Sequence, residues 1–187
     1  MPGNTKVVWT SGGNIAKNCN RIIEQMEGDW VWLIGDDHVF HPDTLKRLVA
    51  HDVDMVVPLC SQRIPPYSYG LYHFGENGAG ELMNLTRQTG LVPVDLSGSA
   101  GLLVRSYVFK SLDRPYFRLG QRNAETEGED FDFLIRAQQA GFRLYVDTDT
   151  PIGHTATTCA WPQRLPDGSY GTRLDLDPNL NLTMRFA

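Results

Sequence analysis

Hydrophobic residues along this chain occur in short blocks with two kinds of spacing. Trp30–Ile34 is a continuous apolar run of strand length, which is typical of a strand that is buried on both faces of a sheet. Val53–Val57, which is apolar except for Asp54, is expected to be the next buried strand. Before the first run, apolar residues recur at helical spacing from Ile15 to Met26, and Asn14 precedes them as a suitable N-cap. These blocks predict a helix followed by two buried strands.

Two further segments extend this alternation. Lys6–Thr10 is predicted to form a short strand, and Pro42-Asp43-Thr44 opens a second helix with Leu45, Leu48 and Val49 on one face. The first third of the chain is therefore expected to run strand, helix, strand, helix, strand. That order predicts an α/β fold with a mostly parallel central sheet flanked by helices.

The remaining elements are predicted to be shorter and more widely separated. We expect strands over Leu91–Asp95, Gly101–Arg105 and Arg143–Val146, and helices over Ser106–Leu112 and Glu129–Ala140. Periodicity is lost after residue 155. We therefore expect one domain, with residues 1–155 carrying its functional site and residues 156–187 forming an irregular, loop-rich extension of the same domain.

Composition places the chain among ordinary globular proteins. It has 187 residues, of which 41% are hydrophobic and 21% charged, so a single domain with its own core is expected. The net charge of −5 disfavours binding to a nucleic-acid backbone as the main activity. Three widely spaced cysteines are expected to be free thiols, and no apolar stretch is long enough to span a membrane, so a cytoplasmic protein is expected.

The pair Asp36-Asp37 directly follows the apolar run Trp30–Ile34. In open α/β sheets, ligands bind outside the carboxyl ends of the strands. Carboxylates there can bind Mg²⁺ or Mn²⁺, whose remaining ligands come from phosphates and water. The alternative is a solvated turn, in which Asp is also common.

A second acidic group, Glu129-Asp130-x-Asp132, lies at a predicted helix start. The helix macrodipole by itself favours acids in the first turn. The functional alternative is that one carboxylate acts as a general base or positions an acceptor hydroxyl, which requires hydrogen-bond reach of the proton that it removes.

His154 follows the predicted strand Arg143–Val146 and again lies near the carboxyl end of a strand. A single histidine is more often structural than a ligand. If it lies close to Asp37, however, its neutral imidazole suits Mn²⁺ better than Mg²⁺. His38 adjoins the acid pair and is a weaker ligand candidate.

Two loops offer candidate substrate contacts. The segment Ser97-Gly98-Ser99-Ala100-Gly101 has glycines that could let a substrate approach the backbone closely, although such segments are often simple turns. Arg63 and Tyr67 lie in the loop after the third strand, where a guanidinium and an aromatic ring could stack on a sugar or a base. Ordinary loop packing is the alternative for both.

Three segments, in this order, resemble GT-A-fold glycosyltransferases, in particular family 2 and its phage-encoded relatives. The resemblance covers roughly residues 6–155. The first segment runs from Asn14-Ile15-Ala16-Lys17-Asn18 through the predicted strand to Gly35-Asp36-Asp37-His38 and Pro42-Asp43-Thr44-Leu45. The second segment is Ser97–Arg105. The third runs from Gly128-Glu129-Asp130-Phe131-Asp132 through Ala140-Gly141 and Tyr145-Val146-Asp147 to Gly153-His154.

The resemblance implies a role for each matching position. Asp37 matches the last Asp of the DxD motif, which binds the divalent metal of a nucleoside-diphosphate sugar, and His154 matches a histidine that completes this metal site in several relatives. Asp130 matches the catalytic base, with Glu129 beside it. The remaining matches are donor-binding positions at Asn14, Lys17, Asn18 and Asp36, and acceptor-side positions at Ser97, Gly98, Ser99 and Asp132.

The resemblance therefore implies a metal-dependent glycosyltransferase of hexosyltransferase type that uses Mn²⁺ or Mg²⁺. An Asp at the base position favours inversion by analogy. Gly35 occupies the place of the first Asp of DxD, and Asp36 is expected to substitute for it. If the protein is encoded by a phage, it is expected in the host cytoplasm.

Relatives begin with a further strand and helix that contact the nucleotide base. This departure leaves open a truncated GT-A module that binds nucleotide or glycan without turnover. A nucleotidyltransferase is also open, since it too places paired carboxylates on an α/β sheet. The acceptor stays open among glycan, protein, lipid and modified DNA base, as does assembly into a homo-oligomer.

Overall fold

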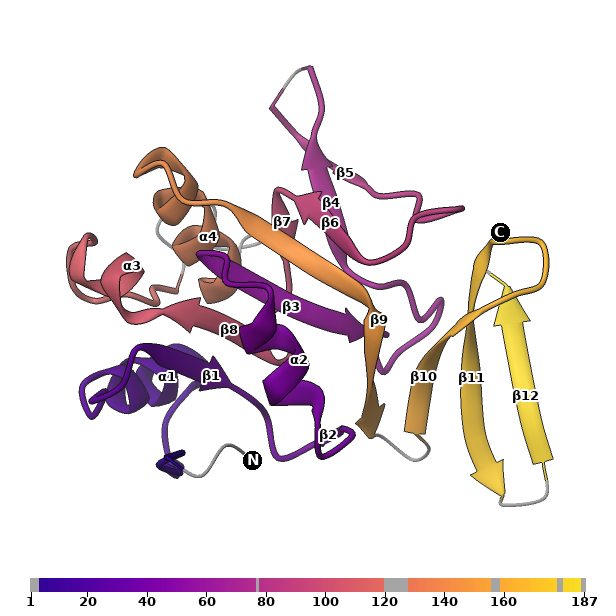
Figure 1. The fold of residues 1–187 in the computed structure, drawn as a ribbon, viewed down its shortest axis with the longest axis horizontal. Coiled ribbons are helices and arrows are strands. Elements are labelled where there is room, and N and C mark those ends of the chain that lie inside the picture. Colours follow the sequence, from indigo (N-terminus) through magenta and orange to yellow (C-terminus); the bar gives the residue numbers. More distant parts are fainter. Residues whose placement is uncertain (1–3, 77, 120–127, 156–158, 178–179, 186–187) are drawn as a thin grey trace.

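A computed structural model describes residues 4–76, 78–119, 128–155, 159–177 and 180–185 of the chain (Figure 1). Four helices are present in these ranges: α1 (Ile15–Ile23), α2 (Thr44–Ala50), α3 (Ser106–Lys110) and α4 (Glu129–Gln139). The strands are β1 (Trp30–Leu33), β2 (His38–Val39), β3 (Met55–Cys60), β4 (Leu71–Phe74), β5 (Gly80–Leu82), β6 (Leu91–Val94), β7 (Leu96–Ser97), β8 (Leu102–Arg105), β9 (Leu144–Thr155), β10 (Cys159–Arg164), β11 (Tyr170–Asp177) and β12 (Leu180–Arg185).

Most of the strands belong to one sheet, in the order β1-β8-β3-β9-β10-β11-β12, with β2 and β6 also paired to β9. The predicted α/β class is confirmed. The prediction of a mostly parallel sheet is wrong, because β3–β9 is the one parallel pair among the described residues. β1 and β3 run in the same direction, but β8 lies between them and is antiparallel to both.

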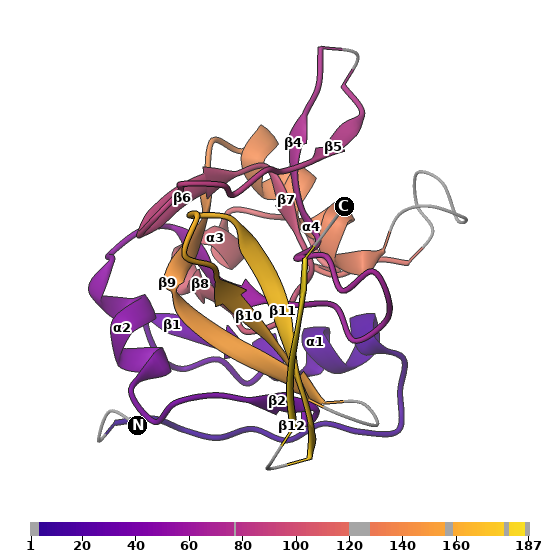
Figure 2. The same ribbon diagram turned by 90° about the vertical axis from the view of Figure 1, so that its right-hand side faces the viewer.

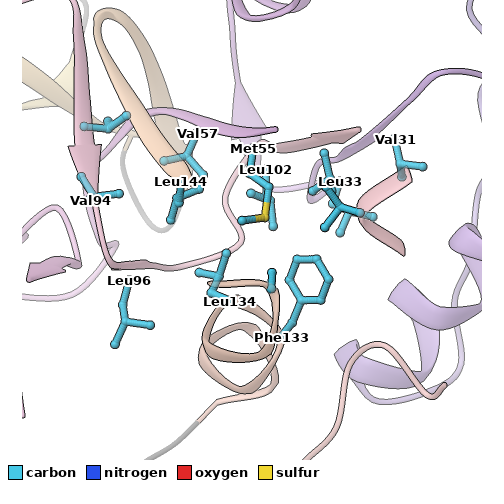
Figure 3. Packing of buried hydrophobic residues seen from close by; sticks show 14 of the residues in the cluster. Val31, Leu33, Met55, Val57, Val94, Leu96, Leu102, Phe133, Leu134 and Leu144 are labelled. Carbon is cyan, nitrogen blue, oxygen red and sulfur yellow. The ribbon is translucent and has the colours of Figure 1, made fainter. Parts of the chain in front are cut away.

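Helices cover both faces of this sheet. Side chains alternate along β3, so Met55, Val57 and Leu59 belong to the larger core with α1, α3 and α4, whereas Val56 packs in a smaller cluster with α2. Figure 3 shows the larger core, in which Phe133 and Leu134 of α4 point toward the strands.

The sequence pattern and the structure differ along β1. Val31 and Leu33 are buried, but Trp30 and Trp32 are only half-buried, so the prediction of a strand buried on both faces is wrong. β1 lies at the edge of the sheet in the described chain. There the Arg105 guanidinium covers the Trp30 ring, 3.8 Å from its centroid.

Lys6–Thr10 forms no strand, which contradicts the prediction. Trp9 is 79% exposed and Val7 57% exposed, so the apolar residues of this segment find no sheet to pair with. Asn14 does cap α1 as predicted, since its side chain accepts the Lys17 backbone N–H at 2.9 Å.

The prediction of a loop-rich extension after residue 155 is also wrong for the described residues. β10 pairs with β9, and β11 and β12 continue the same sheet away from the body of the molecule (Figure 1). A Pro-Asp-Gly-Ser turn connects β10 to β11. Figure 2 turns these strands toward the viewer and shows β4 and β5 projecting beyond the body.

The three cysteines form no disulfide bond in the described part of the chain, as expected. None of the helices in the described ranges is long and apolar enough to cross a membrane.

Gly101 precedes β8 with a φ of +71°, and a Cβ there would lie 2.7 Å from Pro58 Cγ. Gly101→Ala should therefore lower the free energy of unfolding by about 1 kcal/mol for the left-handed backbone and by roughly 1–3 kcal/mol more for the clash. Urea unfolding measures the change. Gly12→Ala is the matched control, because Gly12 has a φ of +74° but open space around its Cβ. An equal loss in both variants would contradict this account of the packing.

Candidate active site

Four loop or strand ends meet at one edge of the main sheet. The last residue of β1, Leu33, pairs with the first residue of β8, Leu102, and β8 runs antiparallel to β3. The end of β3 pairs in parallel with β9, where Cys60 lies opposite Ile152. The acidic turn after β1, the glycine-containing loop before β8, the end of β3 and the last part of β9 therefore share this edge.

This topology brings Asp37 and His154 together from positions 117 residues apart. Asp37 Oδ2 lies 3.1 Å from His154 Nε2. The Asp37 backbone carbonyl accepts hydrogen bonds from the Thr155 N–H and hydroxyl at 2.7 and 2.9 Å, which fix the acidic turn to the end of β9. The predicted convergence of an acid and a histidine is thus present.

The second nitrogen of His154 fixes the orientation of the ring. Nδ1 lies 3.2 Å from the Ser61 carbonyl oxygen, which can only accept a hydrogen bond, so the Nδ1–H tautomer donates to it. Nε2 is the atom that faces Asp37. It donates to Asp37 Oδ2 when it carries a proton, and in the neutral ring it has a lone pair that can bind a metal ion. A divalent ion held between the two would have one carboxylate and one imidazole ligand, a combination that suits Mn²⁺.

Asp37 lies among cationic and titratable groups. Partial burial acts to raise its pKa, but nearby His38 and His154, together with the hydrogen bond from His154, outweigh this effect and lower the pKa below the usual range. Arg63 Nη1 also donates to Asp37 Oδ2 at 2.8 Å. Arg63, predicted to contact substrate, is therefore placed beside the acid.

Two further side chains join this cluster: His38, which the sequence offers as a weaker ligand candidate, and Cys60. Ligand atoms of His38, Cys60 and His154 all lie within 4.8 Å of one another. Cys60 was expected only to be a free thiol. The available signal was its position as the last residue of a buried strand at the sheet edge where the acidic turn was already expected.

Asp130 lies in the first turn of α4 against the predicted glycine-containing loop. It accepts the Ser99 backbone N–H, and a Cβ on Gly98 would lie 3.8 Å from its Oδ2. Burial, with the charge of Glu129 added, raises the pKa of Asp130 to about 6, although hydrogen bonds from backbone N–H groups oppose this. A carboxyl group with a pKa near neutrality is suited to proton transfer.

The other two acids of this turn are buried. Asp132 accepts a hydrogen bond from Arg136 Nε at 2.9 Å, and Arg136 in turn donates to the Tyr116 carbonyl. Through Arg136, Asp132 therefore connects α4 to the segment around Tyr116. Glu129 is 8% exposed and contributes to the field at its neighbour Asp130.

The loop before β8 connects the two acidic groups. Its Ser99 and Gly98 face Asp130, and its last residue, Gly101, packs against Pro58 of β3 and Ile152 of β9, two residues before His154. Ser97 is 3% exposed and its hydroxyl donates to the Gly98 carbonyl at 2.6 Å. The loop backbone thus lies between the candidate base and the Asp37–His154 pair.

The remaining predicted site residues lie elsewhere. Asn14 and Lys17 line a cavity of about 660 Å³ whose lining includes Arg114 and Arg118 but neither Asp37 nor His154. Among the described residues, three others make no hydrogen bond with either acidic group. The Asn18 amide donates to the Gly13 carbonyl, the Tyr67 carbonyl accepts from the Thr172 hydroxyl, and Asp36 is exposed.

The raised pKa of Asp130 makes a prediction about stability. A carboxyl group whose pKa is higher in the folded than in the unfolded chain stabilises the fold at low pH, and this stabilisation is lost as pH rises through about 6. Asp130→Asn should therefore be more stable than the wild type at pH 7, by on the order of 2 kcal/mol, and equal to it below about pH 4. Urea unfolding across this pH range measures the difference. Asp36→Asn, at an exposed position, should retain the wild-type pH dependence, and a pH-independent effect of Asp130→Asn would refute the assignment.

Comparisons with known proteins agree with this architecture. The family model described as Glycosyl transferase family 2 matches residues 1–108, which include the acidic turn and the loop before β8. The solved structure titled "Crystal Structure of A197 from STIV" is similar with a TM-score of 0.56 and 14% sequence identity, over 97% of this chain and 81% of that one. A comparison with curated protein sequences finds no match. The chain belongs to glycosyl transferase family 2, and its fold is the GT-A-like α/β fold that the sequence predicted.

Proposed function

We propose that this protein transfers a hexosyl group from a nucleoside-diphosphate sugar to an acceptor hydroxyl, with inversion at the anomeric carbon. Family membership supports glycosyl transfer in general. The observation that carries the finer proposal is the 3.1 Å approach of Asp37 Oδ2 to His154 Nε2.

Asp37 and His154 would hold the divalent ion. Their atoms are a carboxylate oxygen and an imidazole nitrogen, and the Ser61 carbonyl orients the ring. When bound, such an ion supplies charge neutralisation for the leaving diphosphate. Arg63, 2.8 Å from Asp37, would add a second positive charge beside that diphosphate.

Asp130 would act as the general base. The acceptor oxygen forms a bond to the anomeric carbon, the bond from that carbon to the diphosphate oxygen breaks, and the hydroxyl proton moves to the Asp130 carboxylate. The Ser99 backbone N–H holds this carboxylate at the loop. Since Gly98 has no side chain, an acceptor could approach the backbone closely at this point. Inversion follows if the hydroxyl attacks opposite the diphosphate.

The cavity along α1 is a candidate extension of the substrate site. Lys17, Arg21, Arg114 and Arg118 line it together with one acid, Glu24. This local excess of positive charge, on a chain with a net charge of −5, would favour an anionic part of the donor or the acceptor.

Asp130→Asn should lower kcat by about 10²–10⁴-fold, because the acceptor proton loses its acceptor. In the wild type, kcat should rise with pH through about 6, as Asp130 loses its proton. Release of nucleoside diphosphate from a panel of sugar nucleotides measures both effects. Asp113→Asn, at an exposed position, is the control and should leave turnover unchanged.

The same assay separates the alternatives. Release of pyrophosphate in place of nucleoside diphosphate would identify a nucleotidyltransferase. Nucleotide binding without release of either product would identify a binding module and would contradict the proposed transfer.

Asp37→Ala should abolish metal-dependent binding of nucleoside diphosphate, because it removes one of the two proposed ligands. Isothermal titration calorimetry with and without Mn²⁺ measures the binding. Asp43→Ala removes an exposed acid whose side chain makes no cap hydrogen bond, so it should bind as the wild type does. Equal binding by the wild type with and without Mn²⁺ would refute the proposed metal site.

A further inference from the structure

We infer that His38, Cys60 and His154 form a three-ligand site for a borderline-soft divalent ion of the Zn²⁺ and Co²⁺ class. This inference rests on the metal dependence proposed above and deepens it, because it names two additional ligands and with them the class of ion.

The three residues reach the same face of the sheet for a topological reason. His38 on β2 lies directly opposite His154 on β9, and Cys60 at the end of β3 lies opposite Ile152. Ile152 and His154 are two residues apart on β9, so their side chains point to the same face. Cross-strand partners share a face as well, which brings a thiol and two imidazoles together at the end of β9.

His38 is the observation that most directly indicates a ligand. Its side chain is 7% exposed, and Nδ1 lies 3.2 Å from Asp37 Oδ1. Within the described part of the chain, neither ring nitrogen makes a hydrogen bond of good geometry, Nε2 included. Its ring stacks on that of His154, with centroids 4.6 Å apart. A buried imidazole whose nitrogens lack well-formed hydrogen bonds costs free energy, since it has given up its hydrogen bonds to water. A bound ion would supply the missing partner.

The distances permit a common ion. The three ligand atoms lie within 4.8 Å of one another, and a tetrahedral ion with bonds of about 2.0–2.3 Å requires separations near 3.5 Å. The ligand atoms would therefore have to move closer together by about an ångström, which rotation of the side chains can provide. The bond between His154 Nδ1 and the Ser61 carbonyl leaves Nε2 available as the ligand atom.

The donor set selects the ion. Thiolate and imidazole favour Zn²⁺ and Co²⁺, whereas Mg²⁺ prefers oxygen ligands. On binding, the sulfur–metal bond forms and the Cys60 thiol proton is released to water. Three protein ligands leave a fourth position, which Asp37 would take, and a diphosphate oxygen would be a fifth ligand, as in catalytic zinc sites that expand to five-coordinate.

Cys159 provides the matched control, because it belongs to the opposite face. Gly153 alternates with Ile152 and His154, and a Cβ built on it would lie 2.5 Å from Cys159 Sγ. The Cys159 thiol therefore lies on the other face of β9 from His154, and it is not one of the three clustered ligands.

Titration of the metal-free full chain with Co²⁺ tests the inference. The wild type should develop one equivalent of a thiolate-to-cobalt charge-transfer absorption in the near ultraviolet. Cys60→Ser should lose this absorption, Cys159→Ser should retain it, and His38→Ala should weaken Co²⁺ binding at least about tenfold. Circular dichroism confirms that each variant is folded. Absence of the absorption in the wild type would overturn the inference whatever the variants do.

The same samples separate this inference from the proposed transfer. A wild-type charge-transfer absorption without release of nucleoside diphosphate would support the three-ligand site and refute the transferase. Release of nucleoside diphosphate with Mg²⁺ from a chain that shows no such absorption would support the transferase and overturn the three-ligand site.

Discussion

β3 and β9 pair in parallel over two stretches, from Met55 opposite Leu144 to Cys60 opposite Ile152, and the register shifts between Pro58 and Leu59. This pairing brings the carboxyl end of β3 to the later part of β9, which is also the place where β2 and β10 join the sheet. This register places Cys60 and the Ser61 carbonyl beside His154, while β2 and the Thr155 hydrogen bonds hold the acidic turn at the same end of β9. The candidate site, the added ligands and the contact of Gly101 with Ile152 all depend on this register.

The two principal carboxyl groups have opposite environments. Asp37 lies beside His38, His154 and Arg63, which keep it ionised and suit it to binding a cation. Asp130 is buried at the start of α4 beside Glu129, which raises its pKa to about 6 and suits it to accepting a proton. A pair of acids whose environments move their pKa values in opposite directions is a common way to divide binding from acid–base chemistry.

Much of this could be predicted from the sequence. The apolar blocks located β1 and β3, the Asn14 cap located α1, and the helical spacing of apolar residues located α4, because these signals are local. Asp37, Asp130 and His154 were found because each follows a strand or opens a helix. The strand directions were not predictable in the same way, since β8 enters between β1 and β3 from a distant part of the chain. β10 was missed because its sequence lacks a clear alternation and contains Pro162. β11 and β12 were missed although apolar and polar residues alternate in 174–177 and in Leu180–Arg185, which is a strand signal. Cys60 and His38 were undervalued because only the cross-strand register brings them to His154.

The central claim is that Asp37 and His154 together hold the ion that accompanies a nucleoside-diphosphate donor. Anomalous diffraction from crystals grown with Co²⁺ and a nucleoside diphosphate tests it most directly. The account predicts an anomalous peak between Asp37 Oδ2 and His154 Nε2, with a diphosphate oxygen as a further ligand. A bound nucleotide with no ion at these two residues would contradict it.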